Sequence, residues 1–286
     1  GSFLSPGSIA MTRLPDFLII GAMKAGTTSL YRWLESTGAV VVPSDKEPHF
    51  FSREWDRGID WYASSFAHLA PEHPTGEASV SYTDPQYATA AAERIRNTIP
   101  DVKLIFLARN PAHRLRSHYR HELQRNREHR PFAVAVADPD SAYLRCSLYS
   151  RALEPYSDLF DPSQLLIVEF EDLVRGGGFA RVLTHLGLEG RPRPPGDYNI
   201  TEDKRRFTAA ARWLFDKGLT APLSRLPGPL RQLGRALGTR SDLTYRSTLA
   251  ESHTVPLPED VVRLLVDDVA RLESMVGRQF PWELTD

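Results

Sequence analysis

The chain has 286 residues, of which 41% are hydrophobic and 25% charged, and its formal net charge is −1. This length suits one large α/β domain or two small ones. A net charge so close to zero excludes a surface that is basic throughout, as nucleic-acid binders have, but is compatible with a local basic cleft. The one cysteine, Cys146, cannot form an intramolecular disulfide, so a cytoplasmic location is the default expectation.

The sequence also sets expectations for its ends. No apolar run reaches the roughly eighteen residues that a transmembrane helix needs. Residues 1–10 precede Met11 and are interpreted as a cloning remnant, so we expect one domain over residues 11–286. Nothing in the sequence indicates the oligomeric state.

The first half of the chain alternates buried strands with helices. Residues 17–20 form a continuous apolar run, typical of a strand buried on both faces, and a helix is predicted from Thr27 onward. Residues 103–108 form a second such run. Asn110 and Pro111 follow it, a capping residue and then a proline at the first helical position, and they predict the start of another helix.

The second half continues this alternation. Residues 165–170 predict a third strand, and a helix is predicted around residues 179–186. Residues 208–255 carry a weaker pattern with several prolines and are interpreted as a lid or a substrate-specificity region. The last helix opens at Pro258, and its buried stripe is predicted to be Val262, Leu265, Val266, Val269, Leu272 and Val276. Strands alternating with helices indicate an α/β fold whose parallel sheet is covered on both faces.

A glycine-containing loop follows the first strand, from Gly21 to Thr28. Glycines let a backbone wrap closely around an oxyanion, and the helix N-terminus that follows offers free N–H groups. Lys24 adds a full positive charge. The spacing is similar to a Walker A loop, but the lysine lies three residues before the Walker position, which is Thr27 here.

A second candidate anion site follows the second strand. Arg109 is predicted at the carboxyl end of this strand, where ligands bind in open α/β sheets, and its planar guanidinium suits a phosphate. Ser117 lies on the helix that follows. Because the carboxyl ends of parallel strands share one edge, we expect Arg109 beside the same crevice as the glycine-containing loop.

The segment KEPHFF, residues 46–51, supplies a candidate general base. Glu47 is a carboxylate between Lys46 and His49, and two aromatic residues that can exclude water follow it. Lys46 is interpreted either as a contact of the reacting group or as a solvated side chain, and the sequence does not separate the two.

Together these three segments resemble sulfotransferases that use 3′-phosphoadenosine 5′-phosphosulfate (PAPS), especially the branch with heparan sulfate sulfotransferases and bacterial enzymes. The resemblance implies a P-loop-type three-layer sandwich and a donor site without a metal. It implies that Glu47 is the general base, supported by His49, and that Arg109 and Ser117 hold the 3′-phosphate. The residues implied to hold the 5′-phosphosulfate are Lys24, Ala25, Gly26, Thr27 and Thr28.

The same resemblance implies further contacts. Residues 77–82 are similar to a strand segment of the family, which implies substrate contacts for Glu77, Ser79 and Tyr82, but Ala78 and Val80 replace a lysine and a proline of the family pattern. Tyr149 is implied to help hold the nucleotide. A late basic loop resembles the family's cofactor-closing loop, and one of its three cations is expected to contact the cofactor: Lys204, Arg205 or Arg206.

The resemblance therefore predicts an in-line sulfuryl transfer from PAPS to a hydroxyl, less readily an amine, of a small-molecule, glycoside, lipid or carbohydrate acceptor. Two alternatives stay open. A P-loop kinase or nucleotide hydrolase would need a Walker lysine and a magnesium-holding acid, which Glu169 could imitate at the end of its apolar run. A non-catalytic nucleotide-binding protein could keep Gly26 and Arg109 but would have no use for Glu47 and His49.

Overall fold

The computed structural model describes residues 13–189, 206–207, 239–240 and 243–284. They form two compact units. The first is built from residues 13–22, 26–107 and 154–189, and the second from residues 23–25, 108–153 and the described residues from 206 onward. The prediction of a single domain over residues 11–286 stays a prediction.

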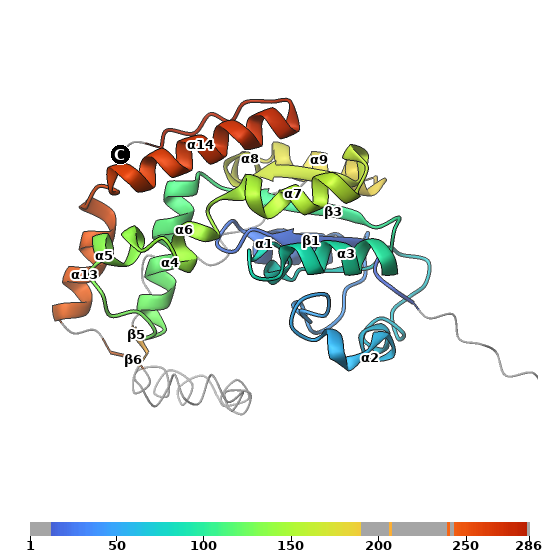
Figure 1. Cartoon of the computed structure of the whole chain (residues 1–286). Helices are drawn as coiled ribbons and strands as arrows, with labels where there is room; N and C mark the ends of the chain where they lie inside the picture. Colours follow the sequence, from blue (N-terminus) through green and yellow to red (C-terminus); the bar gives the residue numbers. More distant parts are fainter. Residues whose placement is uncertain (1–12, 190–205, 208–238, 241–242, 285–286) are drawn as a thin grey trace, which may run out of the picture. The chain divides into compact units, whose positions relative to one another are not determined.

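The first unit is organised by a four-stranded parallel sheet in the order β2-β1-β3-β4. Its strands are β1 (Phe17–Gly21), β2 (Gly76–Glu77), β3 (Lys103–Ala108) and β4 (Leu165–Glu169). All five residues of β1 are buried, because β2 and β3 flank it and helices cover both faces of the sheet (Figure 1). The predicted α/β sandwich with a parallel sheet is confirmed.

Two pairs of helices contact each other beside this sheet. Trp33 on α1 packs against Phe179 on α9, with ring centroids 4.2 Å apart. Arg96 on α3 lies over the ring of Phe160, the residue that follows α7, 5.8 Å from its centroid. The helices of this unit are α1 (Thr27–Thr37), α2 (Ile59–Ser64), α3 (Ala88–Thr98), the second half of α7 (Tyr149–Leu159), α8 (Phe170–Arg175) and α9 (Gly177–Leu186), with short 3-10 turns η1 (Trp55–Arg57), η2 (Val80–Thr83) and η3 (Pro162–Gln164).

Two details of the predicted strands are wrong. Phe170 does not end β4 but begins α8. Residues 77–82 are not one strand, because β2 stops at Glu77 and the chain then turns into η2. The side chains of Ser79 and Ser81 bond to residues of the 46–52 segment instead.

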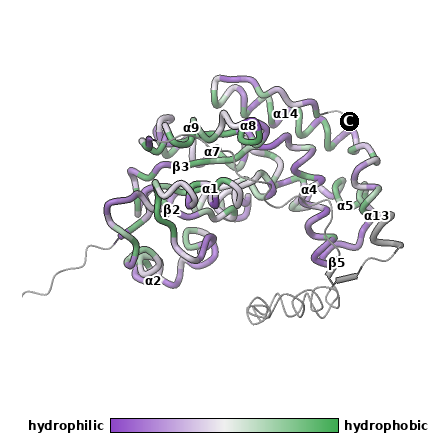
Figure 2. Tube along the Cα trace, turned by 180° about the vertical axis from the view of Figure 1, so that it is seen from behind, coloured by the Kyte–Doolittle hydropathy of each residue, from purple (hydrophilic) through white to green (hydrophobic). Residues whose placement is uncertain are grey.

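The second unit is mainly helical. It contains α4 (Pro111–Gln124), α5 (Phe132–Ala137), α6 (Ala142–Arg145), the start of α7, α13 (Leu243–Thr254), α14 (Glu259–Val276) and an antiparallel pair of short strands, β5 (Arg206–Phe207) and β6 (Thr239–Arg240). The side chain of Asn110 accepts hydrogen bonds from the backbone N–H groups of Ala112 and His113, so the predicted cap of α4 is confirmed. Figure 2 shows hydrophobic and hydrophilic residues alternating along α14. Among the described residues, no helix has the length and apolar character needed to cross a membrane.

The buried face of α14 differs in phase from the predicted stripe. Leu265, Val269 and Leu272 are buried as expected, but Val261 takes the place of Val262, and Val266 is 46% exposed. Val262 and Val276 are only partly buried. The polar residue Asp268 completes this face, where its carboxylate accepts from the backbone N–H and the hydroxyl of Ser150 at the start of α7. A buried polar anchor is invisible to a pattern of apolar residues, which explains the error.

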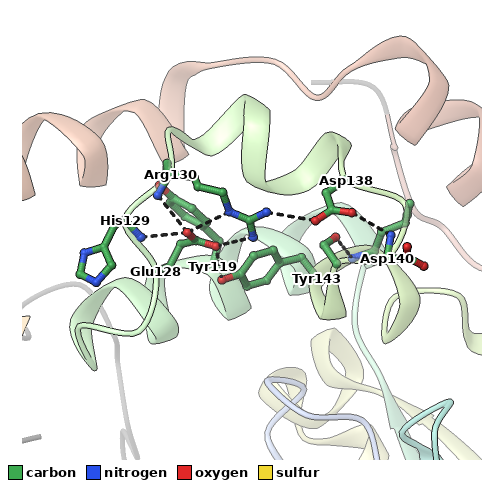
Figure 3. A network of polar contacts seen from close by, with 9 residues as sticks. Tyr119, Glu128, His129, Arg130, Asp138, Asp140 and Tyr143 are labelled. Carbon is green, nitrogen blue, oxygen red and sulfur yellow. Dashed lines mark hydrogen bonds and ion pairs between the residues drawn. The ribbon is translucent and has the colours of Figure 1, made fainter.

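A carboxylate network fixes the turn after α4 (Figure 3). Glu128 accepts hydrogen bonds from the side chain and backbone of Arg130, from the backbone of His129 and from the hydroxyl of Tyr143, at 2.8–3.1 Å. Arg130 also pairs with Asp138 at 3.0 Å. Partial burial acts to raise the pKa of Glu128, but these donors lower it to about 2.

We expect Glu128→Gln to lower the free energy of unfolding by about 2 kcal/mol near neutral pH, since an amide cannot accept all of these bonds. Because the folded-state pKa lies below the ordinary value of 4.5, this contribution is present above pH 4.5 and is lost as the pH falls toward 2. Urea denaturation near pH 7 and near pH 3 measures both effects. The control is Asp138→Asn, an exposed partner of Arg130, for which we expect a much smaller loss because exposed ion pairs contribute little. An equal loss in both variants would contradict the central role of Glu128.

Candidate active site

The loop between β1 and α1 has the strained backbone of a close-fitting turn. Gly26 has a φ of 92°, and a Cβ atom there would lie 2.8 Å from the ring of Phe170, so only glycine fits. Lys24 has a φ of 69° although it is not glycine. Left-handed backbone at such residues costs about 1–3 kcal/mol and concentrates at functional sites. Ala25 and Thr27 are buried, and Thr28 is partly exposed.

Lys24 and Arg109 meet within the second unit. A guanidinium nitrogen of Arg109 lies 3.4 Å from the carbonyl oxygen of Lys24, to which it donates. The hydroxyl of Tyr149 donates to the carbonyl of Arg109 at 2.9 Å. The two residues that the sequence assigned to the donor are thus in contact through the backbone of Lys24, and Tyr149 holds the backbone of Arg109. Ser117 is buried in α4, 3% exposed.

Three further residues of α4 lie near this group, and sequence reasoning did not assign them a role. Arg114 is fully buried and donates to Ser147 at 2.8 Å, to the carbonyl of Tyr143 at 2.6 Å and to the carbonyl of Met23 in the loop at 3.5 Å. His121 Nδ1 lies 3.5 Å from Nζ of Lys24. His118 contacts Arg114, and its pKa is lowered by burial and by the charge of Arg114.

The helical spacing of these α4 residues was the sequence signal that could have identified them as part of the site. Arg114, Ser117, His118 and His121 follow one another at intervals of three, one and three residues, which places them along one side of a helix. Their concentration of donors and positive charge beside Lys24 suits a ligand with negative charge.

The candidate base lies in the first unit, in the loop before η1. Lys46 Nζ donates to Glu47 Oε1, and His49 Nε2 lies 3.6 Å from Glu47 Oε2. The side chain of Glu47 is 34% exposed, against 14% for Lys46 and 24% for His49. Glu47 therefore offers the most accessible polar group of the three.

The protonation state of the His49 ring follows from its burial and its partners. Burial lowers the pKa of His49, although the charge of Glu47 acts in the opposite direction, so the ring is neutral near pH 7. A carboxylate only accepts, so the proton of the neutral ring lies on Nε2, toward Glu47. Nδ1 then accepts from the hydroxyl of Ser81 at 2.7 Å. His49 is also a non-glycine residue with a positive φ, 53°. His49 Nε2 thus faces the candidate base at 3.6 Å, while Nδ1 is bonded to Ser81.

Residues 77–82 support this loop from the interior. The backbone of Ala78 donates to the carbonyl of Lys46 at 2.9 Å, and the backbone of His49 donates to the hydroxyl of Ser79 at 2.9 Å. Glu77, Ser79 and Tyr82 are fully buried. The contact with substrate that the sequence suggested for these three stays a prediction, while their visible role is to hold the loop that carries Glu47.

The late basic loop lies mostly outside the described residues. Lys204 and Arg205 lie outside the described residues, as do residues 208–238 and 241–242 of the predicted lid region. Arg206 is in β5, where its backbone pairs with Arg240 of β6, and residues 243–254 form α13.

The sequence was also compared with known protein families. A model of the sulfotransferase domain matches residues 14–176, more than half of the 286 residues. The chain belongs to the sulfotransferase family. This match covers the loop with Lys24, the KEPHFF segment and the stretch from Arg109 to Ser117, so the family predicted from these motifs is confirmed.

Two curated proteins from mouse are similar to this chain. The heparan sulfate glucosamine 3-O-sulfotransferase 6 of Mus musculus is 33% identical over 187 residues, which covers 62% of this chain and 53% of that protein. The heparan sulfate glucosamine 3-O-sulfotransferase 3A1 of Mus musculus is 30% identical over 201 residues, 64% of this chain and 50% of that protein. The chain thus spans about half the length of the curated relatives it matches.

A solved structure supports the fold. The crystal structure of a sulfotransferase from Alicyclobacillus acidocaldarius superposes with a TM-score of 0.64 over 94% of this chain and 98% of that chain, at 23% sequence identity. This likeness supports the α/β fold predicted from the sequence.

Proposed function

We propose that this protein is a sulfotransferase that moves a sulfuryl group from PAPS to a hydroxyl of a carbohydrate-type acceptor. The observation that carries the proposal is the pairing of Lys24 with Arg109 in a chain whose sulfotransferase-family segment also contains the Glu47 loop. These are the chemical functions that sulfuryl transfer needs: positive charge for a leaving phosphate, an anchor for the nucleotide and a base.

The residues of the loop and of α4 fit an anionic donor. Gly26 permits a tight turn in which a Cβ would meet the ring of Phe170, and Lys24, Arg109 and Arg114 supply positive charge within the second unit. Bound PAPS supplies the sulfuryl group and a phosphate leaving group. Lys24 would hold the 5′-phosphosulfate together with residues 25–28, and Arg109 and Ser117 would hold the 3′-phosphate. Tyr149 would act by fixing Arg109, whose carbonyl it binds.

Glu47 takes the proton of the acceptor hydroxyl in this proposal. The acceptor oxygen then forms a bond with sulfur, while the bond between sulfur and the phosphate oxygen breaks and the electron pair leaves with the phosphate. His49 keeps its Nε2 proton directed at Glu47 and so fixes the carboxylate that accepts. Lys46 donates to the same carboxylate and restrains its position. No covalent intermediate with the protein is needed.

The acceptor class follows from the relatives rather than from the site. Both mouse relatives are named for sulfation of glucosamine in heparan sulfate, so a carbohydrate hydroxyl is the first class to test. A glycoside, a lipid or another small molecule remains an acceptor of the same chemistry. A cytoplasmic location and a role of residues 204–206 in closing over the cofactor stay predictions.

Transfer of radiolabelled sulfate from PAPS tests this proposal directly. The purified protein is incubated in EDTA with glucosamine-containing oligosaccharides, simple glycosides and a phenol as separate acceptors. We expect label in a carbohydrate product, and label that forms about 10²–10⁴-fold more slowly when Glu47→Gln replaces the wild type. Phosphate transfer from ATP in magnesium, with no sulfate transfer to any acceptor, would overturn the proposal.

A further inference from the structure

Glu77 is a fully buried carboxylate with one unpartnered oxygen. Its Oε1 accepts from the hydroxyl of Tyr82 at 2.6 Å and from the hydroxyl of Tyr62 at 3.3 Å. Its Oε2 is buried and has no hydrogen-bond partner in the described part of the chain. A buried polar atom without a partner costs about 1–3 kcal/mol, more when it is charged, so this oxygen requires an explanation.

Two routes connect Glu77 with the loop that carries Glu47. The first runs through Tyr82, whose hydroxyl donates to Glu77 and lies 3.5 Å from the backbone N–H of Phe51, from which it accepts. The second runs through Lys46. Its ammonium donates both to Glu47 and, at 3.3 Å, to the carbonyl of Ala78, the residue next to Glu77. Lys46 is therefore shared between the candidate base and the peptide that follows Glu77.

We propose that Glu77 is a positioning residue for Glu47: it anchors the 46–52 loop through Tyr82 and, when ionised, draws the Lys46 ammonium away from the Glu47 carboxylate. The proposal rests on the proposed role of Glu47 as the base. Glu77 touches no reacting atom in this account. It acts by setting how firmly Lys46 holds the oxygen that must accept the acceptor's proton.

Glu77 changes its ionisation state near neutral pH, within the pH range in which activity can be measured. Burial raises the pKa of Glu77 to about 7, although the hydroxyls of Tyr82, Ser79 and Tyr62 and the charge of Lys46 act to lower it. The groups that face it are Tyr31 of α1, Tyr62 of α2, Tyr82 of η2, Tyr156 of α7 and Lys46. Burial raises the pKa of each of these tyrosines, so all four stay neutral and Lys46 is the cation among these groups.

The direction of the effect follows. Below pH 7, Glu77 carries its proton on the unpartnered Oε2, and Lys46 bonds to Glu47 without competition. Above pH 7, ionised Glu77 attracts Lys46, and Glu47 becomes more available to take a proton. We therefore expect kcat to rise as the pH increases through about 7.

Glu77→Gln separates this charge effect from a structural one. The amide keeps an acceptor for Tyr82 but cannot ionise. We expect kcat close to that of the wild type near pH 6, lower by about tenfold near pH 8 and without the rise through 7, since one unit of pKa corresponds to a factor of ten. The KM for PAPS should not change. Tyr62→Phe, which removes the longer bond and keeps the carboxyl, should retain the rise. A wild-type pH profile in Glu77→Gln would overturn the proposal.

Infrared titration of the wild-type protein in D2O gives a readout that does not depend on activity or on the folding of the variant. We expect a protonated carboxyl band that disappears with a midpoint near pH 7, matches the midpoint of the kcat profile and persists in Glu47→Gln. A wild-type protein without such a band, or with two different midpoints, would overturn the role of Glu77. If Glu47→Gln transfers sulfate at the wild-type rate, the proposed base is wrong instead, whatever Glu77 does.

Discussion

Glu47→Gln lowers kcat for sulfuryl transfer by about 10²–10⁴-fold, the usual contribution of a positioned general base, and leaves binding of the nucleotide product intact. The reason is that the amide keeps the size and the hydrogen-bonding reach of the side chain but cannot accept the acceptor's proton. Its contacts also predict a stable variant, because the side chain is 34% exposed and the loop is held by residues 77–82 through backbone bonds.

Glu54→Gln is the matched control for this substitution. Glu54 follows the same segment, is 42% exposed and pairs with Arg57 at 3.7 Å, so the control removes an equal charge from the same surface. We expect its kcat to stay within about twofold of the wild type, since exposed ion pairs contribute little. A Glu47→Gln enzyme with kcat within a few-fold of the wild type would show that another group takes the proton.

Lys24→Ala lowers kcat by about 10²–10³-fold, the cost of removing one donor from a developing negative charge. It also weakens binding of 3′-phosphoadenosine 5′-phosphate, because the lysine holds the 5′-phosphate in both the donor and the product. The measurement is kcat from sulfate transfer together with Kd from calorimetry.

Lys24→Gly, compared with Lys24→Ala, separates the effect of losing the ammonium group on activity from the effect of backbone strain on stability. The backbone at residue 24 has a φ of 69°, which glycine adopts without strain and alanine does not. We expect the glycine variant to be more stable than the alanine variant by about 1 kcal/mol and as inactive. Equal stability of the two variants would contradict the strain at this residue, and an active glycine variant would contradict the role of the ammonium group.

The parts of the fold that could be predicted are those set by local sequence. Strands β1, β3 and β4 are continuous apolar runs because they are buried on both faces, and the cap of α4 depends on two adjacent residues. The short strand β2 and the turn η2 could not be found in this way. Their shape depends on bonds from Ser79 and Ser81 to a loop about thirty residues earlier in the chain.

In the candidate site, too, some features could be predicted from local sequence and others depend on contacts between distant residues. The nearness of Lys24 and Arg109 followed from the rule that parallel strands end at one edge, and the structure confirms it. The helical spacing of His121 with Ser117 was visible in the sequence, but its contact with Lys24 could not be foreseen, because it joins residues 97 positions apart. Nor could the state of Glu77 be foreseen, since its neighbours Gly76 and Ala78 do not show that Tyr62 and Tyr82 bury it.

Calorimetric titration with 3′-phosphoadenosine 5′-phosphate and with ATP, both in EDTA, tests the central claim most directly. The account predicts tight metal-free binding of the bisphosphate, weakened strongly in Lys24→Ala and Arg109→Ala and unchanged in Glu54→Gln. If the bisphosphate does not bind and ATP binds once magnesium is supplied, the donor is not PAPS and the assignment of Lys24 and Arg109 to it is wrong.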